Sequence, residues 1–351
     1  MLNPMKRKLA ICTRYSRQGA SSRLRYYLYA PALKAAGFET EFHPFFGGRY
    51  LRNLYSGGGK SRLLAGAALA KRLALAPLLP ERLLIEYELL PELSYSVESL
   101  LLGRRRYVLN FDDNVWEKYA ARPRLAGKYD ALCRHAAGVI AANDFLLERI
   151  RPLNVNTIKI PTVVDQQEYV PTTEKFPRFT VVWIGTPVTY AFLEQQAETL
   201  RAMARAVEFE LLVIAGRQLE ARAIPGVPMR FVDWSTETEA ELLALSHIGI
   251  MPLPEEDPFA RGKSAFKLIQ YRAAGIPAIA SPVGGNRTMI VPGETGFLAR
   301  TPEEWVSALR TLHDDEGARL RMGRRARELA AECSLQKYAP VLTAFLEKTL
   351  G

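Results

Sequence analysis

Residues 262–298 read GKSAFKLIQYRAAGIPAIASPVGGNRTMIVPGETGFL, and this stretch decides the fold. A helical pattern over 263–274 ends at Gly275, and the short apolar run 277–280 follows directly. Upstream, apolar runs alternate with helical patterns in the same way. The apolar runs are 179–184, 210–215, 229–232 and 247–252, and the helical patterns lie near 190–206 and 237–246. This alternation indicates βαβ units that build a parallel sheet.

The first half of the chain repeats this pattern. Strands are predicted at 8–12, 38–42, 83–87, 107–111, 138–141 and 157–160, with a helix over 22–36. A polar, proline-bounded segment over 171–177 is typical of a linker. We therefore predict an α/β protein with two doubly wound, Rossmann-like domains, an N-terminal domain over 1–168 and a C-terminal domain over 178–334. The final helix, 335–351, is expected to pack back on the first domain. Ligands of such sheets bind beyond the carboxyl ends of the strands, so we expect a site where the two sheets face each other.

The composition excludes several classes of protein. The chain has 351 residues, 48% apolar and 24% charged, as in soluble globular proteins. An apolar run long enough to span a membrane is absent, and the basic start is followed by too few apolar residues for a signal peptide, so we expect a cytoplasmic protein. Three cysteines without CxxC spacing and four scattered histidines argue against a disulfide framework and a metal centre.

The positive charge is confined to the first half. Residues 1–165 contain 26 Lys and Arg against 14 Asp and Glu, a net charge of +12, whereas residues 166–351 have a net charge of −2. The stretch 60–85 is both basic and rich in leucine and alanine. Such an asymmetry favours a polyanionic partner, although a solvated basic face is the alternative.

Several short motifs of nucleotide-binding and hydrolytic enzymes are incomplete or absent in this sequence. The tripeptides Gly59–Ser61 and Gly262–Ser264 both read GKS, but the earlier glycine of a P-loop is replaced by Leu54 and Asp257. The dinucleotide fingerprint GxGxxG is absent after the first strand, and GxSxG and HExxH are absent throughout. Phosphate-loop NTPases, nicotinamide or flavin enzymes and zinc proteases are therefore disfavoured.

The stretch 262–298 resembles the C-terminal domain of the retaining GT-B glycosyltransferases of the group 1, or family 4, class. Further similarity lies in IPTVVD at 160–165, VWIG at 182–185, GASSRLR at 19–25 and NFDDN at 110–114. The resemblance implies a GT-B fold and transfer of a sugar from a nucleotide-diphosphate sugar with retention of configuration, through front-face attack on the donor. It also implies that no metal or other cofactor is needed.

The chain departs from the family pattern at four places. Gly262 and Gln270 stand where the family has two glutamates, and Asp112 stands where a histidine is common. The basic residues that usually follow the first glycine of the C-terminal domain are missing after Gly185. Two alternatives therefore stay open, an inactive relative that binds glycans or nucleotide sugars or acts as a scaffold, and a GT-B sugar-nucleotide epimerase.

The candidate donor-binding residues come from small-residue loops and a helix start. Helix N-termini bind phosphate through free backbone N–H groups. By resemblance, the amides at the start of the helix after Ser264 face the diphosphate, Gln270 meets the ribose, and Trp234 lies near the base. The predicted donor-binding residues are Gly19, Ala20, Ser21, Ser22, Arg23, Gly185, Thr186, Trp234, Ser264, Ala265, Phe266, Lys267 and Gln270.

Three residues are candidates for the reaction itself. Asp112 and Asp113 end a strand of the first domain, where acceptor and donor sugar are expected to meet. Because neighbouring side chains on an extended chain point opposite ways, one carboxylate is expected to hold a hydroxyl while the other caps the helix over 114–119. Lys263 precedes the helix in the motif and is expected to supply the positive charge that is lost after Gly185.

The acceptor is expected to be a glycan or a lipid-linked glycan, as in the synthesis of cell-surface polysaccharide or lipopolysaccharide. The basic residues that would hold the first domain on the inner face of an anionic membrane are Arg52, Lys60, Arg62, Lys71, Arg72 and Arg82. The alternative is an ordinary core helix whose arginines reach to solvent along apolar stems. Nucleic acid is disfavoured as a partner because no recognition motif with interleaved aromatics is present.

Overall fold

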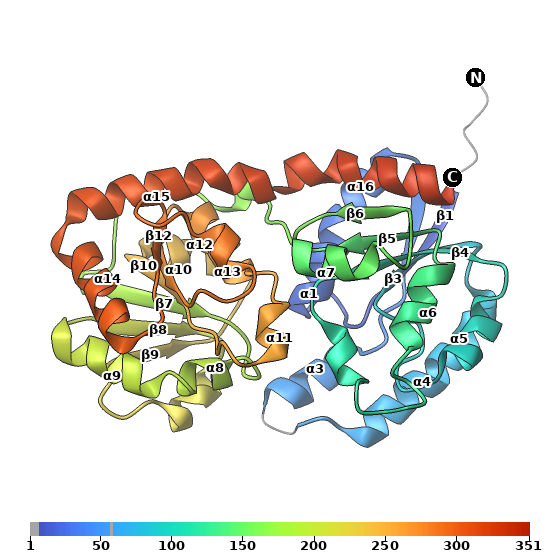
Figure 1. The fold of residues 1–351 in the computed structure, drawn as a ribbon, viewed down its shortest axis with the longest axis horizontal. Helices are drawn as coiled ribbons and strands as arrows, with labels where there is room; N and C mark the ends of the chain where they lie inside the picture. Colours follow the sequence, from blue (N-terminus) through green and yellow to red (C-terminus); the bar gives the residue numbers. More distant parts are fainter. Residues whose placement is uncertain (1–6, 57–58) are drawn as a thin grey trace. The chain divides into compact units, whose positions relative to one another are not determined.

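The computed structural model describes residues 7–56 and 59–351, which form two compact units (Figure 1). The first unit contains the chain up to Val163 together with Leu335–Gly351, and the second is Val164–Ser334. The boundary thus lies before the predicted position 168. The segment 171–177, predicted as a linker, belongs to the second unit.

The first unit is built on a six-stranded parallel sheet with the order β2-β1-β3-β4-β5-β6. Its strands are β1 (Arg7–Cys12), β2 (Phe38–Phe42), β3 (Arg82–Glu86), β4 (Arg106–Phe111), β5 (Gly138–Ala141) and β6 (Thr157–Lys159). Its helices are α1 (Ala20–Arg25), α2 (Ala30–Ala35), α3 (Gly48–Tyr55), α4 (Arg62–Leu75), α5 (Tyr95–Leu102), α6 (Lys128–His135), α7 (Asp144–Ile150) and α16 (Leu335–Leu350). Short 3-10 turns are η1 (Tyr27–Tyr29), η2 (Ala76–Leu78) and η3 (Val115–Lys118).

The central strands of this sheet are buried on both faces. Leu83 and Ile85 pack into one apolar core, and Leu84 packs into another on the opposite face. A continuous apolar run is what a parallel strand covered by helices on both sides requires. Helix α16 covers part of the second face, since it contacts α2 and β4 (Figure 1).

The helix predicted over 22–36 is interrupted. The helix α1 ends at Arg25, because Tyr26 leaves the helical conformation at φ −136° and ψ −59°. Helix α2 begins again with Pro31 in its first turn, where the missing N–H of proline costs nothing. The first loop of the sheet is therefore followed by a short helix and a bend.

The basic stretch 60–85 forms α4 and β3, and two of its arginines are not exposed. Arg72 is buried, and its guanidinium donates to the backbone oxygen of His43 at 2.5 Å. Arg82 is half-buried and donates to the backbone oxygen of Leu350 at 2.9 Å. The burial of these arginines corrects the predicted set of six membrane-facing residues. Arg72 also differs from the alternative, in which the arginines reach solvent.

Two leucines in and just after α4 have exposed side chains. Leu63 is 83% exposed, and Leu78, just beyond the helix, is 79% exposed. Lys60, Arg62 and Lys71 are also exposed along this segment. Across residues 7–56 and 59–351, none of the helices combines the length and apolar composition that crossing a membrane requires.

The second unit has a six-stranded parallel sheet with the order β12-β11-β10-β7-β8-β9. Its strands are β7 (Thr180–Ile184), β8 (Glu210–Ile214), β9 (Met229–Val232), β10 (Ile248–Met251), β11 (Ala278–Ala280) and β12 (Gly296–Leu298). Its helices are α8 (Tyr190–Glu194), α9 (Ala197–Ala206), α10 (Glu239–Leu245), α11 (Pro258–Arg261), α12 (Phe266–Ala274), α13 (Asn286–Met289), α14 (Pro302–Asp314) and α15 (Glu316–Ala330), with 3-10 turns η4 (Gln166–Glu168), η5 (Arg217–Arg222) and η6 (Ala331–Cys333).

The predicted pair of doubly wound parallel sheets is confirmed. One local prediction in the second unit needs correction, because the helix expected over 190–206 is split into α8 and α9. The edge strand β12, paired with β11, was not predicted. Three residues give too short a pattern for a strand to be recognised in the sequence.

Candidate functional site

In the first unit, the order of the strands reverses next to β1. The chain places β2 on one side of β1 and β3 on the other, and such a switch point is where ligands bind in open α/β sheets. The loop from Thr13 to Gly19 follows β1, Tyr87 follows β3, and Asp112 follows β4. The structure therefore places most of the candidate residues of this unit at one edge of the sheet.

Gly19 and Ala20 form the start of α1, close to the loop after β1. A Cβ atom on Gly19 would lie 2.4 Å from the Cβ of Tyr15, so only glycine fits between this loop and the helix. Arg23, on the same helix, is half-buried. The short helix thus presents Ser21 and Ser22 to the edge of the sheet.

The two serine hydroxyls bind carboxylates of their own unit. Ser22 Oγ donates to Glu86 Oε2 at 2.6 Å. Ser21 Oγ lies 3.1 Å from Glu86 Oε1 and 2.5 Å from Asp112 Oδ2. The hydroxyl of Tyr87 donates to Asp112 Oδ1. The structure therefore brings Asp112 and the two serines together, in contact with Glu86 and Tyr87. Asp113, the next residue, is half-buried.

Glu86 is 2% exposed, and the Arg14 backbone N–H donates to its Oε2 at 2.7 Å. Burial, and then the nearby Asp112 carboxylate, raise the pKa of Glu86 from 4.5 to about 7. Tyr87, the next residue, has a φ of +62°, which L-residues rarely adopt and which is common at functional sites. Glu86 therefore changes its charge near neutral pH.

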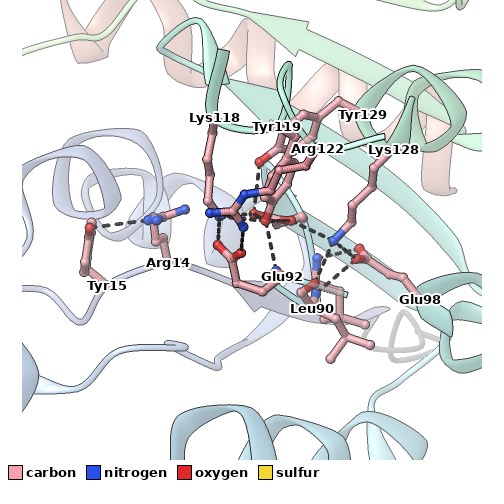
Figure 2. A network of polar contacts seen from close by, with 12 residues as sticks. Arg14, Tyr15, Leu90, Glu92, Glu98, Lys118, Tyr119, Arg122, Lys128 and Tyr129 are labelled. Carbon is pink, nitrogen blue, oxygen red and sulfur yellow. Dashed lines mark hydrogen bonds and ion pairs between the residues drawn. The ribbon is translucent and has the colours of Figure 1, made fainter. Parts of the chain in front are cut away.

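A second network anchors the chain that follows β3 (Figure 2). Lys128 Nζ lies 2.7 Å from Glu88 Oε2 and 2.9 Å from Glu98 Oε2, and all three side chains are fully buried. Burial alone would raise the pKa of Glu88, but the Lys128 and Lys118 ammonium groups outweigh it and lower that pKa. Tyr129 also donates to Glu88, at 2.9 Å. Lys128 and Tyr129 of α6 thus hold the segment that follows β3 and contains Tyr87.

Sequence reasoning missed Glu86, Tyr87 and Glu88. A signal was present, because the apolar run Leu83–Ile85 ends in Glu-Tyr-Glu, and charged residues directly after a buried parallel strand lie at its carboxyl edge. The partners of these residues, Ser21, Asp112 and Lys128, are far away in sequence, so the pairing itself could not be predicted.

In the second unit, the strand order reverses between β7 and β10. Gly185 follows β7, and a Cβ there would lie 2.3 Å from the indole ring of Trp183. Thr186 and Thr189 then close a tight turn, in which Thr189 N–H donates to the backbone oxygen of Thr186 at 3.0 Å. Lys267 Nζ lies 5.1 Å from the centre of the Trp183 ring, so α12 starts beside the end of β7.

The loop before α12 is compressed against a glycine pair. Gly284 has a φ of +52°, and a Cβ there would lie 2.5 Å from the backbone oxygen of Arg261. A Cβ on Gly285 would lie 2.8 Å from the backbone oxygen of Lys263. Ala265, the N-cap of α12, has a φ of +52°, which costs a non-glycine residue about 1–2 kcal/mol. The loop is thus held in an unusual conformation.

The strained loop directs the first amides of α12. Phe266 and Lys267 are the first residues of the helix, and their N–H groups have no carbonyl one turn earlier inside it. Ser264 is half-buried beside them, while Lys263 Nζ lies 4.1 Å from the centre of the Phe259 ring on α11. Lys267 is therefore a basic side chain beside Trp183, and Lys263 contacts the ring of Phe259.

Gln270 and Trp234 are joined through two residues that the sequence did not single out. Gln270 is 3% exposed, and its amide donates to Tyr169 OH at 3.3 Å. Tyr169 OH lies 3.4 Å from Glu239 Oε1, and Trp234 Nε1 donates to Glu239 Oε2. The missed residue Tyr169 lies between the predicted domains, just before the predicted linker over 171–177.

Comparison with known proteins places residues 178–315 in a match to the family model described as Glycosyl transferases group 1. The D-inositol 3-phosphate glycosyltransferase of Corynebacterium glutamicum (strain R) is 40% identical over 85 residues, which are 24% of this chain and 20% of that protein. The protein of the same name from Paenarthrobacter aurescens (strain TC1) is 35% identical over 86 residues, 24% of this chain and 21% of that protein. The matched part therefore spans about a fifth of the length of these curated relatives.

Two solved structures resemble almost the whole chain. Sucrose-phosphate synthase from Thermosynechococcus elongatus has a TM-score of 0.72 at 18% identity and covers 97% of this chain and 98% of its own. Anabaena HepE in complex with UDP-glucose has a TM-score of 0.69 at 14% identity and covers 97% of this chain and 99% of its own. At such low identity, the likeness shows the fold that the chain shares with these proteins.

Replacing Glu86 by glutamine is expected to change how stability depends on pH. Because the folded state raises the pKa of this carboxyl from 4.5 to about 7, the folded protein binds the proton more tightly, and wild-type stability falls as pH rises through that window. The free energy of unfolding of Glu86→Gln, relative to the wild type, should therefore rise by about 3 kcal/mol between the two ends of the window. Urea unfolding at a series of pH values measures this, and parallel curves for the two proteins would contradict it.

Replacing Gly284 by alanine is expected to destabilise the second unit by about 2–4 kcal/mol, because a positive φ and a backbone clash act together. Gly293→Ala is the matched control, since φ there is +79° but nothing lies within 4 Å of the added Cβ. The control should lose only the conformational term, about 1 kcal/mol. Equal losses of thermal stability in the two variants would show that the contact between the added Cβ and the backbone oxygen of Arg261 does not destabilise the protein.

Proposed function

We propose that this protein, whose residues 178–315 match the family model described as Glycosyl transferases group 1, is a glycosyltransferase that uses a nucleotide-diphosphate sugar. The observation that carries this proposal is the loop at the start of α12. Its conformation is fixed by Ala265 and by the close approach of Gly284 and Gly285, and it lies in the part of the chain that matches the family model. Backbone amides at such a helix start suit a diphosphate, whose charge increases as the sugar leaves.

The remaining donor contacts follow from the same edge of the second sheet. Gly185 and Thr186 lie at the switch point beside α12, and Lys267 Nζ adds a positive charge near them. Gln270 is proposed to contact the ribose, and Trp234 is proposed to contact the base. Hydrogen bonds through Tyr169 and Glu239 connect these two side chains. No step of this binding uses a metal ion, because the amides and the ammonium group are proposed to balance the phosphate charge.

The finer parts of the proposal concern the reaction. We propose retention of configuration by front-face attack, as the family resemblance implies, with Asp112 and Asp113 near the reacting sugars. The acceptor is proposed to be a glycan or lipid-linked glycan of a cell-surface polysaccharide or lipopolysaccharide. The loss of both family glutamates, at Gly262 and Gln270, favours one competing function, a relative that binds nucleotide sugars without turning them over.

Uridine diphosphate is a suitable first probe, since a structural neighbour is solved with UDP-glucose. Lys263, which precedes α12, is proposed as a second phosphate contact besides Lys267. Lys263→Ala is expected to weaken UDP binding by about tenfold or more and to leave uridine binding unchanged, because a charge-assisted contact to phosphate is lost. Isothermal titration measures both affinities. Arg261→Ala is the matched control, since that exposed side chain donates to the backbone oxygen of Glu255.

Equal UDP affinities for Lys263→Ala and the wild type would show that Lys263 does not contact the phosphate and would leave Lys267 as the phosphate contact. Release of UDP from UDP-glucose in the presence of candidate glycans then tests catalysis. Binding of the nucleotide sugar without release of UDP, over a panel of acceptors, would favour the binding relative over the transferase.

A membrane surface is proposed as the place of action. The exposed apolar side chains of Leu63 and Leu78 lie on the same segment as the exposed charges of Lys60, Arg62 and Lys71. Each basic side chain near an anionic leaflet contributes about 1 kcal/mol, and shallow burial of leucine adds to it. The protein is therefore proposed to lie on the inner, cytoplasmic face of the membrane through its first unit.

Sedimentation with vesicles checks this proposal. Arg62→Glu combined with Lys71→Glu is expected to lower binding to anionic vesicles by about tenfold or more, because two attractive charges become repulsive. Arg324→Glu, an exposed residue of α15 in the second unit, is the matched control and should bind like the wild type. Equal binding of all three proteins, or equal binding to neutral vesicles, would remove α4 from the interface.

A further inference from the structure

A small cavity in the first unit lies between the end of β2 and one side of α4. Its volume is about 60 Å³. Three basic residues line it, His43, Lys71 and Arg72, and the other lining residues are apolar. Because a water-sized group needs roughly 10–15 Å³, the cavity holds about four to six such groups. It is therefore large enough for one phosphate group.

Arg72 is a buried cation in the wall of this cavity. The residue is 4% exposed, and its Nη2 donates to the backbone oxygen of His43. Its guanidinium carbon lies 5.7 Å from the centre of the Phe45 ring. In the part of the chain that the structure describes, Arg72 forms no ion pair with a carboxylate. Because arginine is almost never fully buried unless it is paired, this guanidinium indicates an anionic ligand.

His43 supplies a second polar group to the same cavity. Its backbone N–H donates to the oxygen of Ile11 at 2.9 Å, which fixes the residue beside the end of β1. Its ring nitrogen Nε2 is buried and makes no hydrogen bond within residues 7–56 and 59–351, since Glu41 Oε2 is 3.5 Å away. Burial, and then the Arg72 guanidinium, lower the pKa of His43. The imidazole is thus mainly neutral at neutral pH and has one N–H to donate.

The rest of the lining favours an anion as well. Lys71, next to Arg72 on α4, is exposed and also lines the cavity, so it adds a positive charge that solvent reaches. Phe42 and Leu75 are among the apolar residues that shield the cavity from water, which strengthens the attraction between a charge and its partner. Among the described residues, no acidic side chain lines the cavity.

We propose that this cavity binds one phosphate group through Arg72, Lys71 and His43. Arginine and lysine are the usual phosphate-binding side chains, and the tetrahedral group accepts hydrogen bonds from several directions at once. Donors from α4 and from the chain after β2 therefore reach the same anion. The phosphate belongs either to a lipid headgroup or to a small molecule in solution. Only the lipid source rests on the proposed action at a membrane, and it adds a specific site to the attraction by exposed basic residues.

Two variants test the cavity in different ways. Ala68→Leu fills it without changing any charge, because Ala68 lines the cavity from α4 and leucine is a good helix former. Ala70→Leu is the matched control, since Ala70 is exposed on the same helix and does not line the cavity. Arg72→Met removes the buried charge but keeps a long side chain beside Phe45. Thermal unfolding of each variant checks that the fold is kept.

An NMR titration of the His43 imidazole in the full chain measures the binding of inorganic phosphate, and His43→Gln identifies the resonance. A nearby anion favours the charged imidazole, so phosphate is expected to raise the pKa of His43 saturably and by more than sodium chloride of equal ionic strength. Ala70→Leu should respond like the wild type. Ala68→Leu and Arg72→Met should bind phosphate about tenfold more weakly or worse. A wild type that responds equally to both salts, or a wild-type response in Ala68→Leu, would overturn the proposal.

Sedimentation with vesicles of phosphatidylcholine and phosphatidic acid, whose headgroup is a bare phosphate, identifies the source. Ala68→Leu keeps the charge of the protein, so the general attraction to an anionic surface is unchanged. Weaker binding by Ala68→Leu than by the wild type and Ala70→Leu assigns the cavity to a lipid headgroup. Equal binding, together with the phosphate response of His43, assigns it to a phosphate in solution. A wild type that binds no anionic vesicle contradicts the proposed membrane action, while the titration of His43 still decides whether the cavity binds phosphate.

Discussion

Parallel strand pairing is the constraint on which the rest of this structure depends. Every strand in both sheets runs parallel to its neighbours, so the chain returns to the same edge after each helix and all the loops at the carboxyl ends collect there. In the first unit, this brings the starts of α1 and the ends of β3 and β4 together. In the second, it brings the end of β7 beside α12. Residues separated by a hundred positions thus become neighbours.

The two acidic residues at the end of β3, Glu86 and Glu88, are both buried, but their surroundings shift their pKa values in opposite directions. Glu88 faces Lys128 and Lys118, so the energy of bringing its charge out of water is offset by cations and by tyrosine hydroxyls. Glu86 accepts only neutral donors in the described contacts and lies near Asp112. One carboxylate therefore stays charged and holds the backbone, while its neighbour two residues away titrates near neutral pH.

In the second unit, close backbone contacts hold the loop of the candidate site, whereas in the first unit charged side chains and their hydrogen bonds do so. Gly284 and Gly285 approach the loop after α11 so closely that side chains would collide with its carbonyl oxygens. This contact holds Ala265 in a left-handed conformation, and the strain is stored where α12 presents its first amides. A rigid loop of this kind presents N–H groups in fixed positions, which electrostatic stabilisation of a charged leaving group requires.

The sequence by itself determined the two parallel sheets, nearly all the strands, and the loops in which the site residues lie, because short apolar runs and glycines carry local signals. It also placed Asp112 at the end of a strand and the serines at the start of the first helix. It did not indicate Glu86 as the partner of the serines, Tyr169 and Glu239 as the partners of Gln270 and Trp234, or the burial of Arg72 against His43. Only the tertiary structure decided these, since hydrogen bonding and desolvation depend on which distant side chains share a buried space, and periodicity along the chain contains no information about that.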